Sequence, residues 1–104
     1  MEVTVKFIVR YHITDQDKYL PLVKKWAALS SDQRANEPGE GIRKIAHWAD
    51  IGCPRGVVVV ESSDPIAVAT WCGRWNPHLE TEVTPVVDED ELGLVSQRIA
   101  DAVS

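Results

Sequence analysis

The sequence predicts one α+β domain of ferredoxin-like βαββαβ topology, with a four-stranded antiparallel sheet and an additional C-terminal helix. Three observations support this prediction: an alternating apolar pattern near the N-terminus, two amphipathic stretches that follow helix-capping residues, and a run of valines bounded by turns. The chain has 104 residues, a length that fits a single domain over residues 1–104.

The first strand and the first helix follow from hydrophobic periodicity. Residues 3–12 alternate, which is the pattern of a strand with one apolar face. The apolar face carries Val3, Val5, Phe7, Val9 and Tyr11, and the other face carries Thr4, Lys6, Ile8, Arg10 and His12. A helix should follow with Asp17 as its N-cap and Pro21 in its first turn. Its apolar stripe would contain Tyr19, Leu22, Val23, Trp26, Ala27 and Leu29.

The middle of the chain reads as a loop followed by a hairpin. Residues 36–41 are rich in glycine and polar residues and form a loop by composition. Residues 42–49 and 57–61 are predicted strands, joined by a turn over residues 51–56. Because the second of these strands contains four consecutive valines, it should be a central strand of the sheet.

The second helix and the fourth strand have clear boundary signals. Asp64 is the expected N-cap and Pro65 the first helical residue, while Pro77 ends the helix. The apolar stripe of this helix would contain Val68, Trp71, Cys72 and Trp75. Residues 79–87 form the fourth strand, and Pro85 places that strand at an edge of the sheet.

The C-terminal helix should have Asp88 as its N-cap, with the three carboxylates of Glu89, Asp90 and Glu91 in its first turn, where they suit the helix dipole. Its stripe at helical spacing, expected to be buried, contains Leu92, Val95, Ile99 and Val103.

Right-handed crossovers place both main helices on one side of the sheet and leave the other side bare. A second copy is the expected cover, so the sequence predicts a homodimer formed through the sheet face. The first strand would then direct Lys6, Arg10 and His12 toward the shared interior. Because buried charge is costly unless it is paired, these residues suggest a polar-lined cavity.

Composition excludes several classes of function. The net charge of −5 and the scattered basic residues argue against nucleic-acid binding. The longest apolar run, residues 57–60, is far too short for a membrane span, and the alternating N-terminus does not resemble a signal peptide. A cytoplasmic location is therefore expected, with Cys53 and Cys72 as reduced thiols.

Residues 41–91 resemble a known family. The segments GIRKIAHWAD and GVVVVESSDPIAVATWCGRWNPHLETEVTPVVDEDE are similar to a group of small bacterial proteins of unknown function in the dimeric α+β barrel superfamily. The resemblance implies this fold and a dimer. Other members of the superfamily include cofactor-independent monooxygenases, muconolactone isomerases and haem-degrading enzymes, and they often bind small aromatic or apolar molecules between sheet and helices.

Candidate catalytic residues lie on or near the first strand. His12 would move a proton near neutral pH, and Arg10, on the same face, would hold an anion. Glu61, at the end of the valine strand, would serve as a base or pair with Arg10. Lys6 is a further ligand-binding candidate. The plainer alternative is that these groups form structural ion pairs and solvent contacts.

The second strand and the second helix supply further ligand-binding candidates. Trp71 and Trp48 would wall an aromatic pocket, and the alternative is that large side chains fill a small core. Because His47 alternates with Trp48, these two side chains point to opposite faces, and only one of them can see a cavity.

No metal or other cofactor is expected. His47, Cys53, Cys72 and His78 are spaced too widely for a typical zinc site. Trp71 and His78 loosely match the tryptophan and histidine of haem-degrading barrels, but the first strand lacks the asparagine of those enzymes.

The sequence therefore favours a protein that binds or transforms a small aromatic or enol-like acid between sheet and helices, in the manner of cofactor-independent monooxygenases or isomerases. The alternative is a non-catalytic interaction or assembly module, which would present its acidic helix ends and the loop at residues 36–41 to a protein partner.

Overall fold

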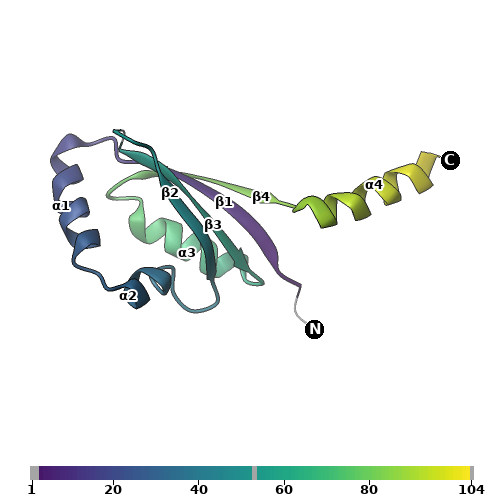
Figure 1. Ribbon diagram of the computed structural model, residues 1–104, viewed down its shortest axis with the longest axis horizontal. Coiled ribbons are helices and arrows are strands. Elements are labelled where there is room, and N and C mark those ends of the chain that lie inside the picture. Colours follow the sequence, from purple (N-terminus) through teal and green to yellow (C-terminus); the bar gives the residue numbers. More distant parts are fainter. Residues whose placement is uncertain (1–2, 53, 104) are drawn as a thin grey trace.

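The computed structural model describes residues 3–52 and 54–103, which form a four-stranded antiparallel sheet and four helices (Figure 1). The elements are β1 (Val5–His12), α1 (Gln16–Ala27), α2 (Ser31–Ala35), β2 (Arg43–Ala49), β3 (Arg55–Ser62), α3 (Pro65–Trp75), β4 (Glu80–Val86) and α4 (Glu89–Val103). The order βαββαβ with an additional C-terminal helix confirms the predicted fold class.

The sheet has the strand order β2-β3-β1-β4, so β1 and β3 are central, as the valine run predicted. Strand β1 pairs with β3 and with β4, and β2 pairs with β3, all antiparallel. Pro85 lies in the edge strand β4, where a missing N–H is tolerated. The other edge strand, β2, has a bulge between Lys44 and Ala46.

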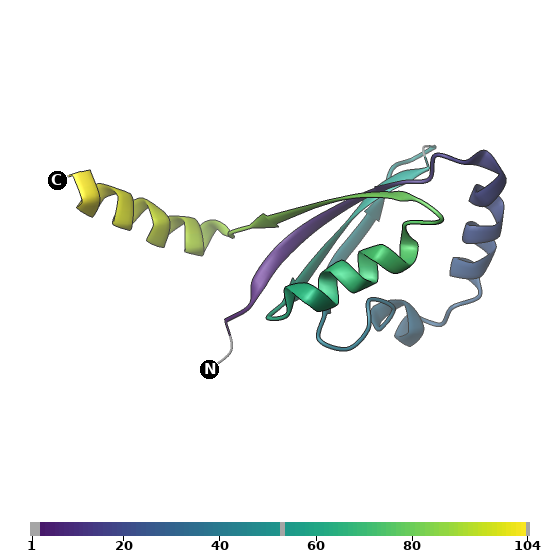
Figure 2. The same ribbon diagram turned by 180° about the vertical axis from the view of Figure 1, so that it is seen from behind.

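Helices α1 and α3 lie on the same side of the sheet, as expected (Figure 2). The buried core lies between α3 and the two central strands. Its members are Val9, Val58, Val60, Val68, Trp71 and Cys72. The predicted stripe of α3 is thus confirmed, with Trp75 packed partly buried against it. In contrast, α1 buries none of its residues.

The start of α3 is as predicted. The Asp64 carboxylate accepts hydrogen bonds from the N–H groups of Ile66, at 3.0 Å, and Ala67, at 3.3 Å. The buried Ser62 hydroxyl donates to the Gly41 carbonyl at 2.6 Å and accepts from the Asp64 N–H at 2.9 Å. The end of β3, the start of α3 and the loop before β2 are therefore tied together at one serine.

The start of α1 differs from the prediction. Asp15, rather than Asp17, is the N-cap, because Asp15 has the extended backbone of a capping residue and accepts from the Asp17 N–H at 2.9 Å. Pro21 consequently lies inside the helix, beyond its first turn.

A short helix, α2, was not predicted. It is stabilised by a capping box, in which the Ser30 hydroxyl accepts from the Gln33 N–H at 3.1 Å and the Ser30 N–H donates to the Gln33 side chain at 2.8 Å. The spacing of Ser30 and Gln33 was the sequence signal for it. The following segment, 36–41, contains turns with Gly39 and Gly41 at positive φ, as its composition suggested.

The predicted burial of the α4 stripe is wrong. Helix α4 projects away from the sheet (Figure 1), and Leu92, Ile99 and Val103 are 52%, 59% and 80% exposed. Its capping is as expected, since Asp88 accepts from the Glu91 N–H at 2.8 Å. An amphipathic stripe indicates that a face needs a partner, and within the described part of the chain α4 reaches none.

No helix within residues 3–52 and 54–103 has both the length and the apolar character that a membrane crossing requires.

Candidate functional site

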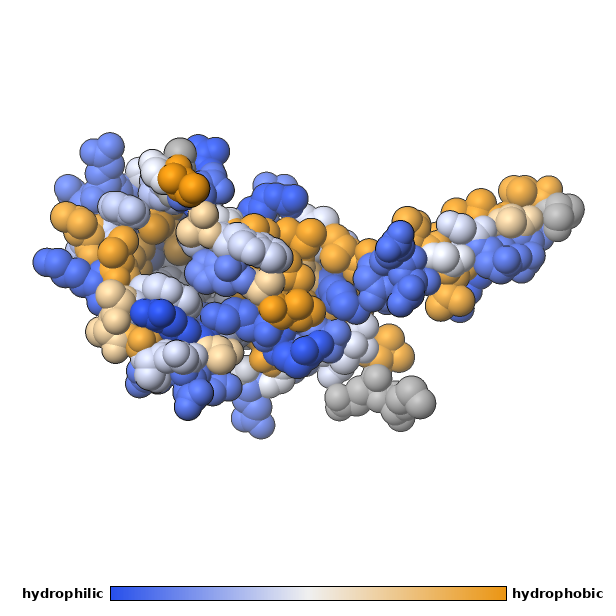
Figure 3. Space-filling model, in the orientation of Figure 1, coloured by the Kyte–Doolittle hydropathy of each residue, from blue (hydrophilic) through white to orange (hydrophobic). Residues whose placement is uncertain are grey.

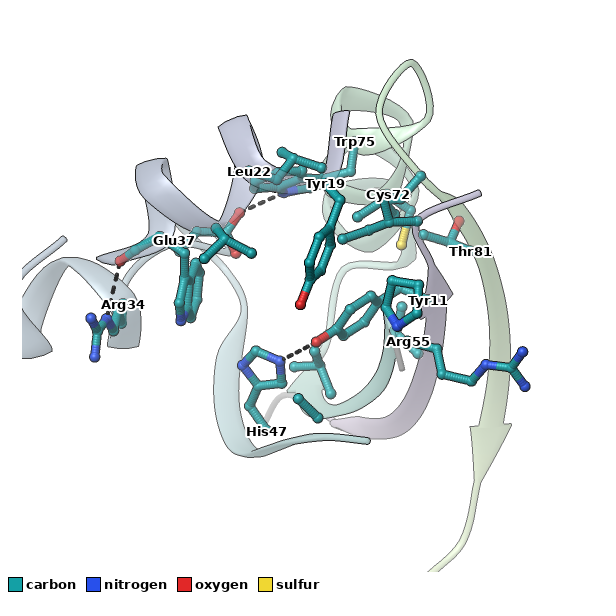
Figure 4. A pocket seen from close by; sticks show the side chains of 18 of the residues that line it. Tyr11, Tyr19, Leu22, Arg34, Glu37, His47, Arg55, Cys72, Trp75 and Thr81 are labelled. Atoms are coloured by element: carbon teal, nitrogen blue, oxygen red, sulfur yellow. Dashed lines mark hydrogen bonds between the residues drawn. The ribbon is translucent and has the colours of Figure 1, made fainter. Parts of the chain in front are cut away.

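A cavity of about 420 Å³ lies between the sheet and the helices (Figure 4). Its size falls in the range of about 300–1,000 Å³ that is common for small-molecule sites. The wall is largely apolar and includes five aromatic side chains, Tyr11, Tyr19, Trp26, Trp71 and Trp75. Strands β1, β2 and β3 form its floor, and α1 and α3 form its sides.

One large side chain of α1, Trp26, lies between this helix and the sheet beside the cavity. The Trp26 ring meets the His47 ring edge to face, with centroids 5.4 Å apart. The Lys44 ammonium lies 5.0 Å from the centre of the Trp26 ring, and the Arg34 guanidinium lies 5.9 Å from it. Trp26 thus spans the gap between α1 and β2 and leaves open space beside it.

A hydrogen-bonded pair of side chains points into this space. The Tyr11 hydroxyl lies 2.8 Å from His47 Nε2, and the two rings meet edge to face (Figure 4). Tyr11 belongs to β1 and His47 to β2, so the pair reaches across the central strand β3. Gly56 makes room for it, because a Cβ at that position would lie 2.5 Å from the Tyr11 hydroxyl.

Both members of the pair are held neutral. Burial lowers the pKa of His47, and the nearby charge of Lys44 lowers it further. Burial also raises the pKa of Tyr11, with a contribution from the charge of Asp50. Near neutral pH, a neutral phenol therefore faces a neutral imidazole, an arrangement that can relay a proton.

Glu37 fixes two of the aromatic walls. Its carboxylate accepts from Trp71 Nε1 at 3.0 Å and from Trp75 Nε1 at 2.5 Å. The Arg74 guanidinium donates to the carbonyl of the buried Pro38 at 3.2 Å, which holds the same loop against α3. Both indole rings are therefore set in place by hydrogen bonds as well as by packing.

One end of the cavity carries cations. Lys44 donates to the Arg34 carbonyl at 2.6 Å. Burial lowers the pKa of Lys44, while the charge of Glu37 raises it. Because Lys44 and Arg34 both stand over Trp26, a ligand that reaches this wall would meet positive charge.

Cys72 also lines the cavity and is buried. Burial raises the pKa of its thiol, and the charge of Glu37 adds to the shift. The thiol is therefore protonated near neutral pH and acts as part of the apolar wall.

The structure separates the residues that the sequence nominated. His47 and Trp71 line the cavity. Trp71 is 5% exposed and serves as core and as cavity wall at once. Lys6, Arg10, His12, Glu61 and Trp48 lie on the opposite face of the sheet, which we call the open face. As predicted, His47 and Trp48 point to opposite faces, and Trp48 is 61% exposed.

The charged groups of the open face pair differently from the expectation. Glu61 lies 3.2 Å from Arg43 and 3.6 Å from Lys6, so its partners are these two cations and not Arg10. Arg10 lies opposite Glu82 in the register of β1 with β4, and His12 lies opposite Glu80. The structure thus brings Lys6 and Glu61 together and keeps this group away from the cavity.

Sequence reasoning did not nominate Tyr11 or Glu37 as functional residues. The alternation of β1 did place Tyr11 on the apolar face of the strand, and Gly56, which was expected in a turn, is the residue whose missing side chain leaves room for the Tyr11 ring. Glu37 lies in a loop, and no local pattern indicates that its carboxylate meets two indoles.

The sequence contains a widely spaced set of four potential zinc ligands, His47, Cys53, Cys72 and His78. Over residues 3–52 and 54–103, no group of three or more His, Cys, Asp and Glu side chains could hold a metal ion. Cys53, one member of the pattern, lies outside the described residues. His78 packs against the Trp75 ring, with centroids 6.2 Å apart.

Comparisons with known proteins give one result. A family model described as a domain of unknown function (DUF3303) matches residues 5–100. No curated protein and no solved structure matches the chain significantly. The match agrees with the resemblance to a family of unknown function and leaves the dimeric α+β barrel superfamily a prediction.

Proposed function

The chain belongs to the family described as a domain of unknown function (DUF3303), and we propose that this member binds and transforms a small aromatic or enol-like acid in the cavity between sheet and helices. One observation carries the proposal: a neutral phenol–imidazole pair, Tyr11 and His47, points into a largely apolar cavity with several aromatic side chains in its wall. An aromatic wall favours a planar ligand, and Lys44 and Arg34 favour an acidic group at one end.

The pair suits proton transfer from an enol or a phenol. The ligand hydroxyl would pass its proton to the Tyr11 oxygen while Tyr11 passes its own proton to His47 Nε2. The products are a ligand enolate and a protonated His47, so every proton is accounted for. Return of the proton to a carbon of the enolate gives an isomerase. Attack of an enolate carbon on dioxygen as co-substrate, with return of the proton from His47, gives a hydroperoxide; loss of water from it leaves one oxygen atom in the product as a carbonyl group, as in a cofactor-independent monooxygenase.

Phenylpyruvate, an aromatic keto acid with a stable enol, is a suitable first probe. We expect the wild-type chain to accelerate its enol–keto interconversion, measured by ultraviolet absorbance. Tyr11→Phe should slow the catalysed rate at least tenfold, because it removes the hydroxyl and keeps the ring. Trp48→Phe, on the open face, is the matched control and should react as the wild type does.

The probe also separates binding from chemistry. Quenching of tryptophan fluorescence by phenylpyruvate reports occupancy, since Trp26, Trp71 and Trp75 line the cavity. Saturable quenching without rate acceleration would retain the binder and reject the enzyme. Absence of both, across a panel of hydroxylated aromatic acids, would refute the proposal.

The proposal includes a homodimer formed through the open face, as in the dimeric α+β barrel superfamily. The centre of this face is half-buried and apolar, with Ile8, Val57 and Val59 side by side on the two central strands. Charged side chains border this patch, because Arg10 lies opposite Val57 in the register of β1 with β3 and Arg55 is the first residue of β3. An apolar centre with a charged rim is the usual anatomy of a protein interface.

A second candidate function, a non-catalytic interaction module, is favoured by one observation, the exposed apolar stripe of α4. It requires no ligand in the cavity. Phenylpyruvate binding that depends on Tyr11 would argue against it, whereas a cavity that takes none of the panel would leave it as the better account.

A further inference from the structure

Helix α4 carries an apolar stripe that nothing in the described part of its own chain covers. Leu92, Val95, Ile99 and Val103 follow one another at intervals of three and four residues, which places them on one side of the helix. They are between 38% and 80% exposed. Figure 3 shows the corresponding hydrophobic surface along the projecting arm.

Helix α4, which we call the arm, is held to the sheet at its first turn. The Lys6 ammonium of β1 lies 3.0 Å from the Asp88 carboxylate and 3.5 Å from that of Glu91. Asp88 and Glu91 also bond each other's backbone N–H groups, at 2.8 Å and 3.0 Å. The first turn of α4 is therefore tied to the central strand, and the helix leaves the sheet in a defined direction.

A helix of this length gains little stability alone. Isolated helices of about 12–15 residues are marginal in water, and most helices in proteins depend on the packing of an apolar face. Helix α4 has 15 residues and contains Gly93, which weakens it further. A partner surface is the simplest source of the missing stability.

We propose that α4 packs on a second copy of this chain and extends the interface made by the open face of the sheet. This inference rests on the dimer of the proposed function. The size of the interface supports this proposal. One face of a sheet of four strands, each about eight residues long, measures roughly 19 Å by 26 Å, about 500 Å². A specific interface buries about 800 Å² on each partner, so the sheet alone falls short.

Helix α4 supplies most of the missing area. Fifteen residues span about 22 Å, and a stripe about 10 Å wide adds roughly 220 Å² to the interface of each copy. A two-fold dimer uses both surfaces twice, because each chain offers one sheet face and one arm. A second copy therefore covers two otherwise bare apolar surfaces with the same contact.

Charge is compatible with this occupant. Glu89 and Asp90 begin the arm, and Asp101 lies near its end. Across residues 3–52 and 54–103, Arg10 and Arg55 of the open face form no salt bridge. The acidic arm of one copy can thus reach Arg10 and Arg55 on the open face of the other, where Glu80 and Glu82 lie nearby.

The test compares two lysine substitutions on opposite sides of α4 in the full chain. Ile99→Lys places a charge in the stripe, whereas Gln97→Lys places the same charge on the far side, where Gln97 now donates a hydrogen bond to Asp101 at 2.9 Å. Sedimentation velocity over a concentration series measures the dimer dissociation constant. We expect Ile99→Lys to raise this constant at least tenfold and Gln97→Lys to leave it within twofold of the wild type.

Val59→Lys, on the open face, separates the arm from the sheet. If Val59→Lys dissociates the dimer and Ile99→Lys does not, the sheet dimer stands and the role of α4 is overturned. If the wild type is monomeric at every concentration, the dimer and the role of α4 fall together, while the cavity proposal is tested independently by phenylpyruvate.

Hydrogen exchange provides a readout that does not depend on a variant. The amides of α4 should be protected in the wild-type dimer and should lose protection on dilution below the dissociation constant. Protection that is independent of concentration would mean that α4 packs on its own chain. Either that result or a lack of protection in the dimer would overturn the inference.

Discussion

Helices α1 and α3 cover the same face of one sheet, yet they do so in different ways. Helix α3 buries Val68, Trp71 and Cys72 against the central strands, while α1 buries none of its residues. The start of α3 is tied through Ser62 to two other segments. Helix α1 is linked at its ends, where Lys18 donates to the Pro77 carbonyl and Trp26 meets His47.

The difference divides the helix-covered side of the molecule into a packed half around α3 and a cavity half around α1. Side chains of α3 should determine the free energy of unfolding, because they fill the core. Side chains of α1 should determine ligand binding, because they border the cavity. Each prediction below tests this division, from the largest expected effect to the smallest.

Trp71→Ala and Trp26→Ala compare the two halves directly. Trp71→Ala should lower the free energy of unfolding by about 3–5 kcal/mol, since it empties a buried site. It also removes a hydrogen bond to Glu37. Trp26→Ala should lower the free energy of unfolding by less than about half of that amount, because this ring is only partly buried. It should nevertheless abolish phenylpyruvate binding. Urea denaturation and fluorescence quenching provide the two measurements, and equal losses of stability would contradict the division.

Gly56→Ala should disturb β3, the central strand against which α3 packs and which forms part of the cavity floor. A Cβ there would lie within 2.7 Å of Tyr11 and of the Trp48 carbonyl, so the Tyr11 ring must move away from His47. Overpacking of this kind costs about 1–3 kcal/mol. Gly93→Ala, in α4, is the matched control: nothing lies within 4 Å of its Cβ, and it should stabilise the helix by about 0.5–1 kcal/mol. A Gly56→Ala chain with unchanged stability would show that Tyr11 does not depend on this glycine.

His47, in the cavity half, should make the stability of the fold sensitive to pH. Its pKa in the folded chain is lowered by burial, whereas the unfolded chain has the ordinary value of about 6.5. The unfolded state therefore binds more protons between these two values. The stabilisation is complete above about pH 6.5 and is lost as the pH falls through the lowered pKa. Urea midpoints between pH 8 and pH 5 should fall less for His47→Gln than for the wild type. Parallel curves would show that His47 titrates alike in both states.

The smallest effect concerns the rate at which Cys72 reacts. Burial raises the pKa of its thiol, so alkylation at pH 8 should be slower than for a free cysteine. Because the sequence has two cysteines, the measurement uses a Cys53→Ser variant, in which the alkylation rate is that of Cys72. Phenylpyruvate should slow the reaction further, because Cys72 lines the cavity. Rapid alkylation that ignores the ligand would mean that this part of the wall opens freely.

Local signals were sufficient for most of the fold. The valine run identified a central strand, Pro85 identified an edge strand, and Asp64 with Pro65 fixed the start of α3. The misplaced N-cap of α1 reflects two aspartates two residues apart, where only backbone conformation decides between them. The burial of α4 could not be predicted, because periodicity shows which face is apolar and not what covers it.

The candidate site depended on information that periodicity does not contain. Tyr11 and His47 meet only because β1 and β2 flank β3 in a particular register. Glu37 reaches two indoles because a loop folds back over α3. The sequence nominated His47 and Trp71, which line the cavity between sheet and helices, and their role in ligand binding stays a prediction. It gave priority to Arg10 and His12, because charged residues on a central strand suggested a polar interior.

The two edges of the sheet bear on how the protein avoids aggregation. An exposed strand edge is a template on which another chain can add a strand, and proline and bulges are two devices that hinder such addition. Pro85 lies in one edge strand, and the bulge between Lys44 and Ala46 interrupts the other. Indefinite growth of a continuous sheet from copy to copy is therefore disfavoured at both ends. A chain built this way can leave one face of its sheet uncovered during synthesis with less risk of forming fibres.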